Sequence, residues 1–359
     1  MFAKATQLLL LSALVGSSSA FAPSSRVATS TLLSKPMTSG NFRLYQASPE
    51  EKEMDSQEAK AEHEMASLDL SKTIYTASVK SPKDSYVAFA EKGAANAKMA
   101  KRKILHQSIL GGCYVGFGGL LSLTVAGNIP GVGAMNPGLV KMAFAALFPV
   151  NLLLIVTTGG QLFTGNSATC AAALYERLID QRELWRNWSV SLIGNVIGCG
   201  LMALAASYCG LLTGGTAALT SSTAVGKVGA TFGKNFVKAV LCNWMVSLAV
   251  YLSGASNDLA GKLVGIWFPI STFVAIGLEH SVANLFIMPA ALLLGVPLTF
   301  RDVMMRNVIP VLLGNAVAGA IVVAGSYSYQ FGCLGGTQRA IFAAKLAEYE
   351  ARKKKKLPQ

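Results

Sequence analysis

The stretch that decides the fold is Ile276-Gly277-Leu278-Glu279-His280-Ser281-Val282-Ala283-Asn284, which sets a carboxylate beside an imidazole inside a long apolar run. Between Leu263 and Phe300 no other residue carries a charge. Ionisable groups at membrane depth are costly and usually face a protein-lined or watery interior, so they are candidate functional residues. The stretch therefore predicts that His280 lies at the centre of a transport pathway.

This apolar run is too long for one helix, since roughly 20 apolar residues already cross a bilayer. We expect two half-helices that meet at a break near His280. Irregular backbone survives at that depth only where protein or a cavity satisfies its polar groups. Transporters use such breaks to direct helix ends at their ions, so the break and His280 form one predicted site.

A second segment repeats this design 120 positions earlier in the chain. Its break is predicted within residues 159–166, Gly-Gly-Gln-Leu-Phe-Thr-Gly-Asn. Paired interrupted segments in two halves of a chain point to a binding site in the middle of the membrane. The matched pairs at this spacing are Phe148-Pro149 with Phe268-Pro269, Arg186-Asn187 with Arg306-Asn307, and Gly194-Asn195 with Gly314-Asn315.

The composition is that of a polytopic membrane protein, because the mean hydropathy is +0.46 and only 14% of the 359 residues are charged. A net charge of +13 can indicate nucleic-acid binding, but much of it sits at chain ends and in loops, where it sets membrane orientation. No nucleic-acid partner is therefore expected. The six cysteines lack metal-type spacing, and we expect no metal, cofactor or disulfide framework.

The first 45 residues have the composition of a targeting region. Lys4 precedes an apolar core and a small-residue stretch, as in a secretory signal, and no acidic residue occurs before Glu50. The join Ser19-Ala20-Phe21-Ala22-Pro23 resembles the two-part plastid signal of diatoms and related algae, which has an aromatic residue just after the cleavage point. Residues 1–45 are predicted to direct the protein to a plastid envelope, with the plasma membrane as the alternative.

The rest of the chain divides into three predicted regions. Residues 46–84 are acidic, poor in apolar side chains and expected to be disordered. Residues 85–335 form the membrane domain, which opens with a basic surface helix over 85–103. Residues 336–359 are a basic tail expected to contact anionic lipid.

Six membrane segments are predicted, and two of them are broken into halves that together make one crossing. An even number of crossings places both termini on the same side, and the distribution of lysine and arginine makes that the positive-inside face. The fold class is therefore an all-α polytopic membrane protein. The segments are 105–128, 139–158 with 165–178, 188–213, 236–255, 262–278 with 281–296, and 307–330.

Three stretches of this domain together resemble signatures of the formate/nitrite transporter family. They are Leu162-Phe163-Thr164-Gly165-Asn166, residues 242–250 (CNWMVSLAV) and Glu279-His280-Ser281-Val282-Ala283-Asn284, in the family's order and spacing. The resemblance covers about residues 100–330 and extends to the algal chloroplast nitrite-transporter branch. It implies an aquaporin-like fold of two inverted three-helix repeats, with five protomers in a ring and a pore in each.

The same resemblance implies roles for individual residues. His280 corresponds to the central pore histidine, with Thr164 facing it from the other break and Asn243 as its polar neighbour. Lys227 corresponds to a cation that draws anions into the outer vestibule, and Glu279 is expected to fix the imidazole tautomer or the local backbone. The constriction residues are Phe148, Leu152 and Phe163 on the inner side and Phe273 on the outer side, and further polar residues of the pore or its packing are Asn166, Asn284 and Asn315.

Chemistry favours a carrier of weak acids, and no enzymatic activity is expected. A bare anion in an apolar constriction costs on the order of several kcal/mol unless it is paired or neutralised. A weak acid can instead accept a proton, cross as a neutral molecule and release the proton beyond, and a histidine with an ordinary pKa near about 6.5 suits that relay. The expected partners are nitrite or formate, protons, the lipid bilayer and four further copies of the chain.

Two other functional classes remain open from the residues. An intramembrane serine protease would pair Ser167 as nucleophile with His280. An aquaporin-like channel for water or small neutral solutes is the closer rival by fold. Against that channel, the paired Asn-Pro-Ala signatures of aquaporins are absent, and Asn136-Pro137-Gly138 is a single loop motif.

Overall fold

The structure is a computed structural model that describes residues 79–336. Six of its helices are long and apolar enough to cross a membrane, which confirms the predicted all-α polytopic fold. The predicted targeting region 1–45, residues 46–78 of the acidic region and residues 337–359 of the tail lie outside the described residues. The spans are Lys101–Gly127, Pro137–Thr158, Gln181–Tyr208, Phe232–Ala255, Leu259–Ile276 and Phe300–Phe331.

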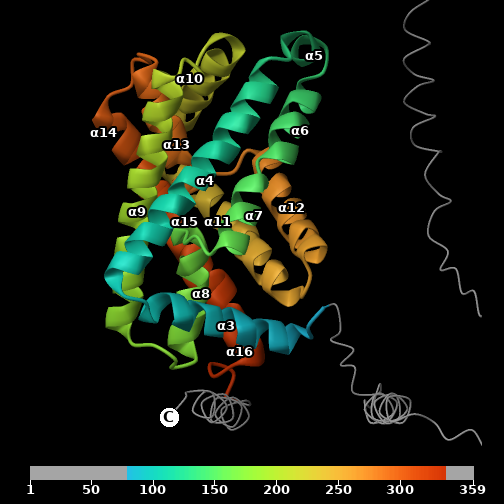
Figure 1. The fold of residues 1–359 in the computed structure, drawn as a ribbon, viewed down its shortest axis with the longest axis vertical. Coiled ribbons are helices and arrows are strands. Elements are labelled where there is room, and N and C mark those ends of the chain that lie inside the picture. Colours follow the sequence, from blue (N-terminus) through green and yellow to red (C-terminus); the bar gives the residue numbers. More distant parts are fainter. Residues whose placement is uncertain (1–78, 337–359) are drawn as a thin grey trace, which may run out of the picture. The chain divides into compact units, whose positions relative to one another are not determined.

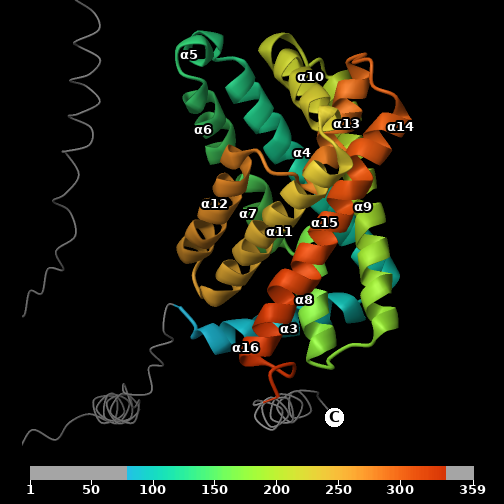
Figure 2. The same cartoon turned by 180° about the vertical axis from the view of Figure 1, so that it is seen from behind.

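The long helices connect two ends of a bundle that short helices mark (Figures 1 and 2). At one end, here called the α3 side, lie α3 (Pro82–Lys98) and α16 (Ser326–Phe331). At the opposite end, the α10 side, lie α5 (Pro130–Met135), α10 (Gly214–Gly229) and α14 (Phe300–Asp302). Between them run α4 (Lys101–Gly127), α9 (Gln181–Tyr208) and α11 (Phe232–Ala255).

Two pairs of half-helices meet in the middle of the bundle, as predicted. The first pair is α7 (Val150–Thr158) with α8 (Phe163–Tyr175), and the second is α12 (Leu259–Ile276) with α13 (Ser281–Leu293). The leading half of each pair ends at a glycine with a positive φ, +83° at Gly159 and +82° at Gly277. Glycine adopts this left-handed conformation without steric penalty, so it ends a helix where the chain must turn.

The last span contains two π-helical segments and starts earlier than the predicted residue 307. It begins with α14, capped by the Thr299 side chain, and continues through η2 (Val303–Val308), α15 (Ile309–Val317), η3 (Ala318–Gly325) and α16. Such π segments shift the register of a helix face and are common beside functional sites.

The predicted surface helix over 85–103 is shorter and more deeply packed than expected. Met99 and Ala100 are both extended, so α3 ends at Lys98 and the basic residues 101–103 begin α4 instead. Tyr86 and Phe89 are buried, and Gly93 lies so close to the Thr169 carbonyl of α8 that a side chain would not fit. The helix is therefore part of the protein core as well as its polar border.

Two further elements differ from the prediction. The predicted half 139–158 lies within the span Pro137–Thr158, but Phe148 and Pro149 interrupt it and divide α6 (Pro137–Leu147) from α7, whereas Pro269 lies inside a continuous α12. The sequence also gave no expectation of α10, whose Gly, Ala, Ser and Thr residues carry little hydropathy signal. This helix positions Lys227, so its omission affects the site described below.

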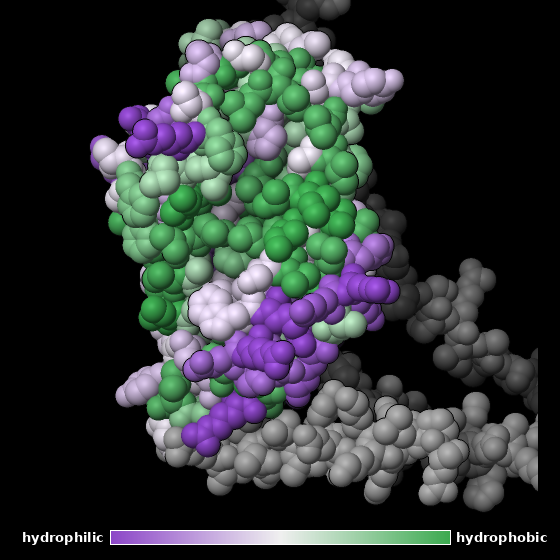
Figure 3. Space-filling view, turned by 90° about the vertical axis from the view of Figure 1, so that its left-hand side faces the viewer, coloured by the Kyte–Doolittle hydropathy of each residue, from purple (hydrophilic) through white to green (hydrophobic). Residues whose placement is uncertain are grey.

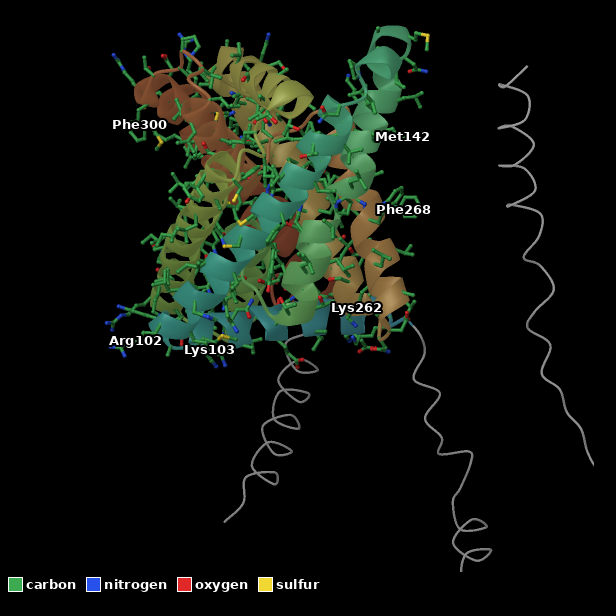
Figure 4. The ribbon with its side chains drawn as sticks, turned by 45° about the horizontal axis from the view of Figure 1, so that its top comes forward. Arg102, Lys103, Met142, Lys262, Phe268 and Phe300 are labelled. Atoms are coloured by element: carbon green, nitrogen blue, oxygen red, sulfur yellow. The ribbon has the colours of Figure 1, made fainter. Side chains whose placement is uncertain are left out.

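The surface has the pattern of a membrane protein. Figure 3 shows an apolar band across this face, bordered by hydrophilic residues towards the α3 side. Arg102, Lys103 and Lys262 lie at the α3 end, while Phe300 lies at the opposite end (Figure 4). Met142 and Phe268 point outward from α6 and α12 and are 60% and 62% exposed, as expected for side chains that face lipid or another subunit.

Candidate functional site

A cavity of about 350 Å³ enters the bundle from the α10 side and reaches His280. Helices α6, α10, α11, α12 and α13 and the second break all contribute to its wall. Its charged residues are Lys141, Lys227, Lys238 and Glu279, so three cations face one carboxylate. Such a net positive concave site attracts small anions and raises their local concentration.

The His280 side chain lies at the start of α13 and is 96% buried, being 4% exposed. Its Nδ1 accepts a hydrogen bond from the backbone N–H of Ala283 at 3.1 Å. An amide donor at Nδ1 leaves no place for a proton there, so the neutral ring carries its proton on Nε2. The backbone of α13 therefore fixes the tautomer.

The Nε2 atom of His280 lies 3.0 Å from the hydroxyl oxygen of Thr164, which comes from the other break. In the tautomer set by Ala283, Nε2 donates and Thr164 Oγ1 accepts. Thr164 is fully buried. The predicted pairing of these two residues across the duplicated breaks is thus present, although they are 116 positions apart in the chain.

Glu279 does not contact the imidazole in the way the sequence suggested. Its Oε2 instead accepts hydrogen bonds from Lys227 Nζ at 3.0 Å, Asn284 Nδ2 at 2.8 Å and Asn307 Nδ2 at 3.1 Å. The amide of Ala283 sets the tautomer, not Glu279, while the alternative role of Glu279 in fixing the local backbone stays a prediction. Glu279 is a buried anion that neutralises Lys227 and binds two amides.

Lys227 is therefore an ion-paired residue rather than a free vestibule cation. Its side chain is 17% exposed and that of Glu279 only 3% exposed. The other two cavity lysines, Lys141 and Lys238, were not singled out from the sequence. They could have been found only through the position of their helices, because a lysine near a helix end is common in any membrane protein.

Asn243 and Asn315 brace the two breaks rather than touch the imidazole. Asn243 Nδ2 donates to the Thr164 carbonyl at 3.2 Å and to the Asn315 carbonyl at 2.7 Å. The Asn315 side chain in turn accepts from Ser281 N at 2.8 Å and donates to the Glu279 carbonyl at 3.1 Å. Asn243 is thus a neighbour of the site that holds Thr164 in place.

The aromatic residues of the predicted constrictions regroup in the structure. Phe273 stacks on His280 with ring centroids 5.7 Å apart, and Phe148 meets Phe273 edge-on at 6.3 Å. Both rings line the cavity from the α10 side. The assignment of Phe148 to the inner constriction is therefore wrong, because its ring lies against Phe273 and lines the cavity on the α10 side.

Leu152 and Phe163 belong to the buried core and do not line the cavity. Phe163 packs edge-on against Trp188 at 6.0 Å. The other predicted polar residues, Asn166 and Asn284, are also buried, and each donates its amide to the side chain at the start of its own break. The acceptors are Gln161 for Asn166, at 2.9 Å, and Glu279 for Asn284, at 2.8 Å.

The arrangement does not support a serine protease. Ser167 donates its hydroxyl proton to the Thr164 carbonyl at 2.7 Å and accepts from Asn243 at 3.0 Å. The imidazole of His280 is paired with Thr164 instead. A nucleophilic serine needs a base that takes its proton, so the proposed pair of Ser167 and His280 is not formed.

Across residues 79–336 no group of three or more His, Cys, Asp or Glu side chains is arranged to hold a metal ion. Asn136, from the lone Asn-Pro-Gly motif, caps α6 through a hydrogen bond from Gly138 N at 3.1 Å. That role is local, so the motif does not correspond to a pore signature.

Comparison with known proteins adds a family relationship to this geometry. The family model described as formate/nitrite transporter matches residues 83–329. A probable formate transporter of Methanothermobacter thermautotrophicus is 42% identical over 270 residues, which cover 71% of this chain and 98% of that protein.

Solved structures of similar fold also come from this group. An "FNT family ion channel" superposes with a TM-score of 0.63 at 26% identity, covering 69% of this chain and 98% of that one. A "pentameric formate channel with formate bound" superposes with a TM-score of 0.58 at 26% identity, covering 65% of this chain and 98% of that one.

Proposed function

The chain belongs to the formate/nitrite transporter family, whose members are channels and transporters rather than enzymes, and we propose that it carries small monovalent weak-acid anions together with protons. The observation that carries this proposal is the lysine-lined cavity that ends at the buried pair of His280 and Thr164. An anion-attracting entrance that leads to a proton-bearing group suits a solute that must lose its charge to proceed.

The first step is capture from the α10 side. Lys141 and Lys238 have no carboxylate partner within the cavity, since Glu279 pairs with Lys227. Their charge supplies the attraction, and Lys227 adds a positive group that Glu279 holds close to His280. The breaks also aim the N-termini of α8 and α13 at the pathway, where helix dipoles favour negative charge.

The second step is neutralisation at His280. A proton from hydronium in the cavity water first binds Nδ1 in place of the Ala283 N–H bond, and the imidazolium so formed gives its Nε2 proton to the anion. The neutral acid moves on, and the ring returns to its resting tautomer by losing the Nδ1 proton to water and taking one back at Nε2. Apolar side chains on the far side, Leu152 and Phe163 among them, then raise a smaller barrier than they would to the anion. On the α3 side the acid releases its proton to water, so the net movement is one anion and one proton.

Nitrite is the first candidate substrate and formate the second. Nitrite is suggested by the predicted plastid address in residues 1–45, because a plastid must import nitrite to reduce it to ammonium. On the same ground we propose that the chain belongs to the algal chloroplast branch of the family. Formate is favoured by the similarity to a channel solved with formate bound. Both are small monovalent weak acids, and the cavity distinguishes charge and size rather than identity.

A fluorescent fusion tests the address. The first 50 residues fused to a fluorescent protein should label the plastid envelope of a diatom, and the same fusion with Phe21→Ala should not. Labelling of the plasma membrane by both fusions would contradict the plastid assignment without affecting the transport proposal.

Reconstitution into liposomes tests the activity. Wild-type protein should take up nitrite and formate faster at lower external pH, and nitrate, whose conjugate acid is strong, should not be carried in this way. His280→Asn keeps an amide donor near Thr164 but cannot exchange a proton, so its uptake should lose the pH dependence while the protein assembles normally. Osmotic swelling in water serves as the control for a neutral-solute channel.

Two results would contradict the proposal. One is rapid swelling in water with no anion uptake, which would favour the aquaporin-like alternative. The other is an unchanged pH dependence in His280→Asn, which would remove His280 from the proton pathway.

A further inference from the structure

Asn195 bonds the first break, between α7 and α8, on both sides. Its Oδ1 accepts from Phe163 N at 2.9 Å, at the first residue of α8. Its Nδ2 donates to the Gln161 carbonyl at 3.0 Å and to the Ser108 carbonyl of α4 at 2.8 Å. One side chain thus ties the break to the neighbouring long helix.

Asn315 makes the same three bonds around the other break. Its Oδ1 accepts from Ser281 N at 2.8 Å, at the first residue of α13. Its Nδ2 donates to the Glu279 carbonyl at 3.1 Å and to the Ala239 carbonyl of α11 at 2.8 Å. The matching bonds make Gln161 the structural counterpart of Glu279.

A second layer of amides supports this equivalence. Asn166 and Asn187 both donate to Gln161 Oε1, at 2.9 and 3.0 Å. Their counterparts in the other half both donate to Glu279 Oε2: Asn284 at 2.8 Å and Asn307 at 3.1 Å. The two halves of the chain therefore build the same cluster around a neutral amide in one case and a carboxylate in the other.

Contacts between the long helices show which residue of the first half occupies the position equivalent to Lys227. Gly194 approaches Leu105 and Ser108 of α4, and Gly314 approaches Phe236 and Ala239 of α11. Each pair of contacted residues is 131 positions apart. If 131 is added to the residue numbers of α3, the result matches the range of α10. The two helices also pack in equivalent ways, because α3 contacts α8 and α10 contacts α13.

At this spacing Lys227 corresponds to Asn96. Asn96 belongs to the cluster around Gln161, because its Nδ2 donates to Asn166 Oδ1 at 3.0 Å and its carbonyl accepts from Asn187 at 3.2 Å. Leu162, which follows Gln161, corresponds to His280, which follows Glu279. The chemically active trio on the α10 side is thus represented on the α3 side by an asparagine, a glutamine and a leucine.

We propose that Asn96 and Gln161 make the pore kinetically asymmetric, so that weak-acid anions are captured with a lower KM from the α10 side than from the α3 side. This inference rests on the proposed transport function. Both halves of the chain have the same asparagine bonds around their break, but only the second half has an ion pair there. Lys227 lines the α10-side cavity and gives one hydrogen bond to Glu279, so its ammonium group can donate another to an anion, whereas Asn96 and Gln161 at the matching positions carry no charge.

Thermodynamics gives this asymmetry a defined signature. At equal pH and zero membrane potential a passive carrier cannot create a gradient, so Vmax divided by KM must be the same in both directions. A lower KM from the α10 side therefore requires an equally lower Vmax from that side. The Lys227–Glu279 pair has no net charge, so the gain comes from a charge-assisted hydrogen bond to Lys227 Nζ, which is about twice as strong as one to a neutral amide, and we expect the two KM values to differ by about tenfold.

Sealed vesicles of both orientations, right-side-out and inside-out, test the proposal with labelled formate or nitrite as the probe. The double variant Asn96→Lys/Gln161→Glu installs the missing ion pair, and it should lower KM on the α3 side several-fold while leaving KM on the α10 side unchanged. A matched control, Ala95→Lys/Gln181→Glu, adds the same two charges at exposed positions of α3 and α9 and should change neither value.

The converse variant keeps the test decisive if the buried charges prevent folding. Lys227→Asn/Glu279→Gln replaces the ion pair by the amides found on the α3 side, and it should raise KM on the α10 side towards that on the α3 side. Equal KM values from both sides in the wild type would overturn the inference while leaving transport itself intact. Absence of any anion uptake in the wild type would instead overturn the proposed function.

Discussion

At the scale of single residues, the site depends on which ring nitrogen of His280 each neighbour bonds. The backbone N–H of Ala283 takes Nδ1, and Thr164 takes Nε2. Both ring nitrogens are used, so the imidazole is fixed in one tautomer and one orientation before a substrate arrives. Asn243 completes this arrangement because it holds the Thr164 carbonyl rather than the ring.

Removal of the Thr164 hydroxyl should slow transport. Thr164→Val keeps the shape of the side chain but leaves His280 Nε2 without an acceptor, and loss of one hydrogen bond of about 1 kcal/mol corresponds to about a fivefold fall in flux. Thr164→Ser should retain most of the activity. Thr169→Val, five residues along α8, is the matched control, because the Thr169 hydroxyl donates to the Gly165 carbonyl of its own helix and not to His280. Equal flux in the two valine variants would show that the hydroxyl of Thr164 is not used.

The ion pair of Lys227 and Glu279 should contribute to folding as well as transport. Lys227→Met leaves a buried carboxylate without its cation, which should destabilise the protein by about 3 kcal/mol. Thermal unfolding in detergent measures this loss as a lower Tm. Lys227→Met/Glu279→Gln should recover most of it, since the remaining amide carries no charge.

Lys234→Met tests the specificity of that result. Lys234 is exposed near the start of α11 and should tolerate the change with no shift in Tm. Similar unfolding temperatures for Lys227→Met and Lys234→Met would contradict the structural role given to the ion pair.

Sequence alone identified the residues whose chemistry stands out against an apolar background. His280 and Glu279 were found because an ionisable pair beside a repeated break is rare at membrane depth, and Thr164 was added by the family resemblance. Gln161 and Asn96 were not found, because neutral amides give no such contrast. The ring of Phe148 was placed on the wrong side, because which side of the bundle a residue in the middle of a span faces depends on tertiary packing, here against Phe273.

At the scale of elements, the two breaks and the close contacts between helices define the pore. The breaks were predictable from the repeat and the glycines. The helix α10 was not, because neither hydropathy nor periodicity marks a short helix rich in Gly, Ala, Ser and Thr. This helix is the equivalent of α3 in the second half of the chain. The equivalence can be recognised only from the contacts between the long helices, which require the structure.

Alanine substitutions at two glycines of α9 should distinguish the effect of helix packing on stability from the effect of helix propensity. A Cβ at Gly198 would lie 2.1 Å from the Ile109 carbonyl of α4, whereas a Cβ at Gly200 would have no atom within 4 Å. Gly198→Ala should therefore destabilise the protein by about 2 kcal/mol or more through overpacking, while Gly200→Ala should be neutral or stabilising by up to about 1 kcal/mol. Unfolding of the two variants in detergent provides the measurement, and a loss in Gly200→Ala as large as that in Gly198→Ala would contradict the α4–α9 packing.

At the scale of the whole molecule, many apolar side chains remain uncovered in a single chain. On α9 alone, Ile193, Val196, Ile197, Leu201 and Leu204 are 40% to 56% exposed. Lipid or neighbouring copies must cover such a face in a membrane. The family resemblance of the sequence predicts a ring of five copies, and the solved channel of similar fold is itself described as pentameric.

Native mass spectrometry of the protein in detergent tests that assembly. We expect a principal species with five times the mass of one mature chain, because the apolar faces of single copies are satisfied by neighbours in the ring. A leucine-to-serine change at an interface position, for which Leu201→Ser is the first choice, should reduce the pentamer fraction. A monomeric wild type that still transports anions would contradict the ring without affecting the pore.

The number of protons that enter with each anion tests the proposed mechanism most directly. Liposomes that contain a pH-sensitive dye should acidify inside as nitrite enters through the wild-type protein, at one proton for each anion and with no membrane potential. Nitrate should neither enter nor acidify the interior. Nitrite entry that leaves the internal pH unchanged and builds up a negative potential inside would mean that the bare anion crosses, and the neutralisation step at His280 would then be wrong.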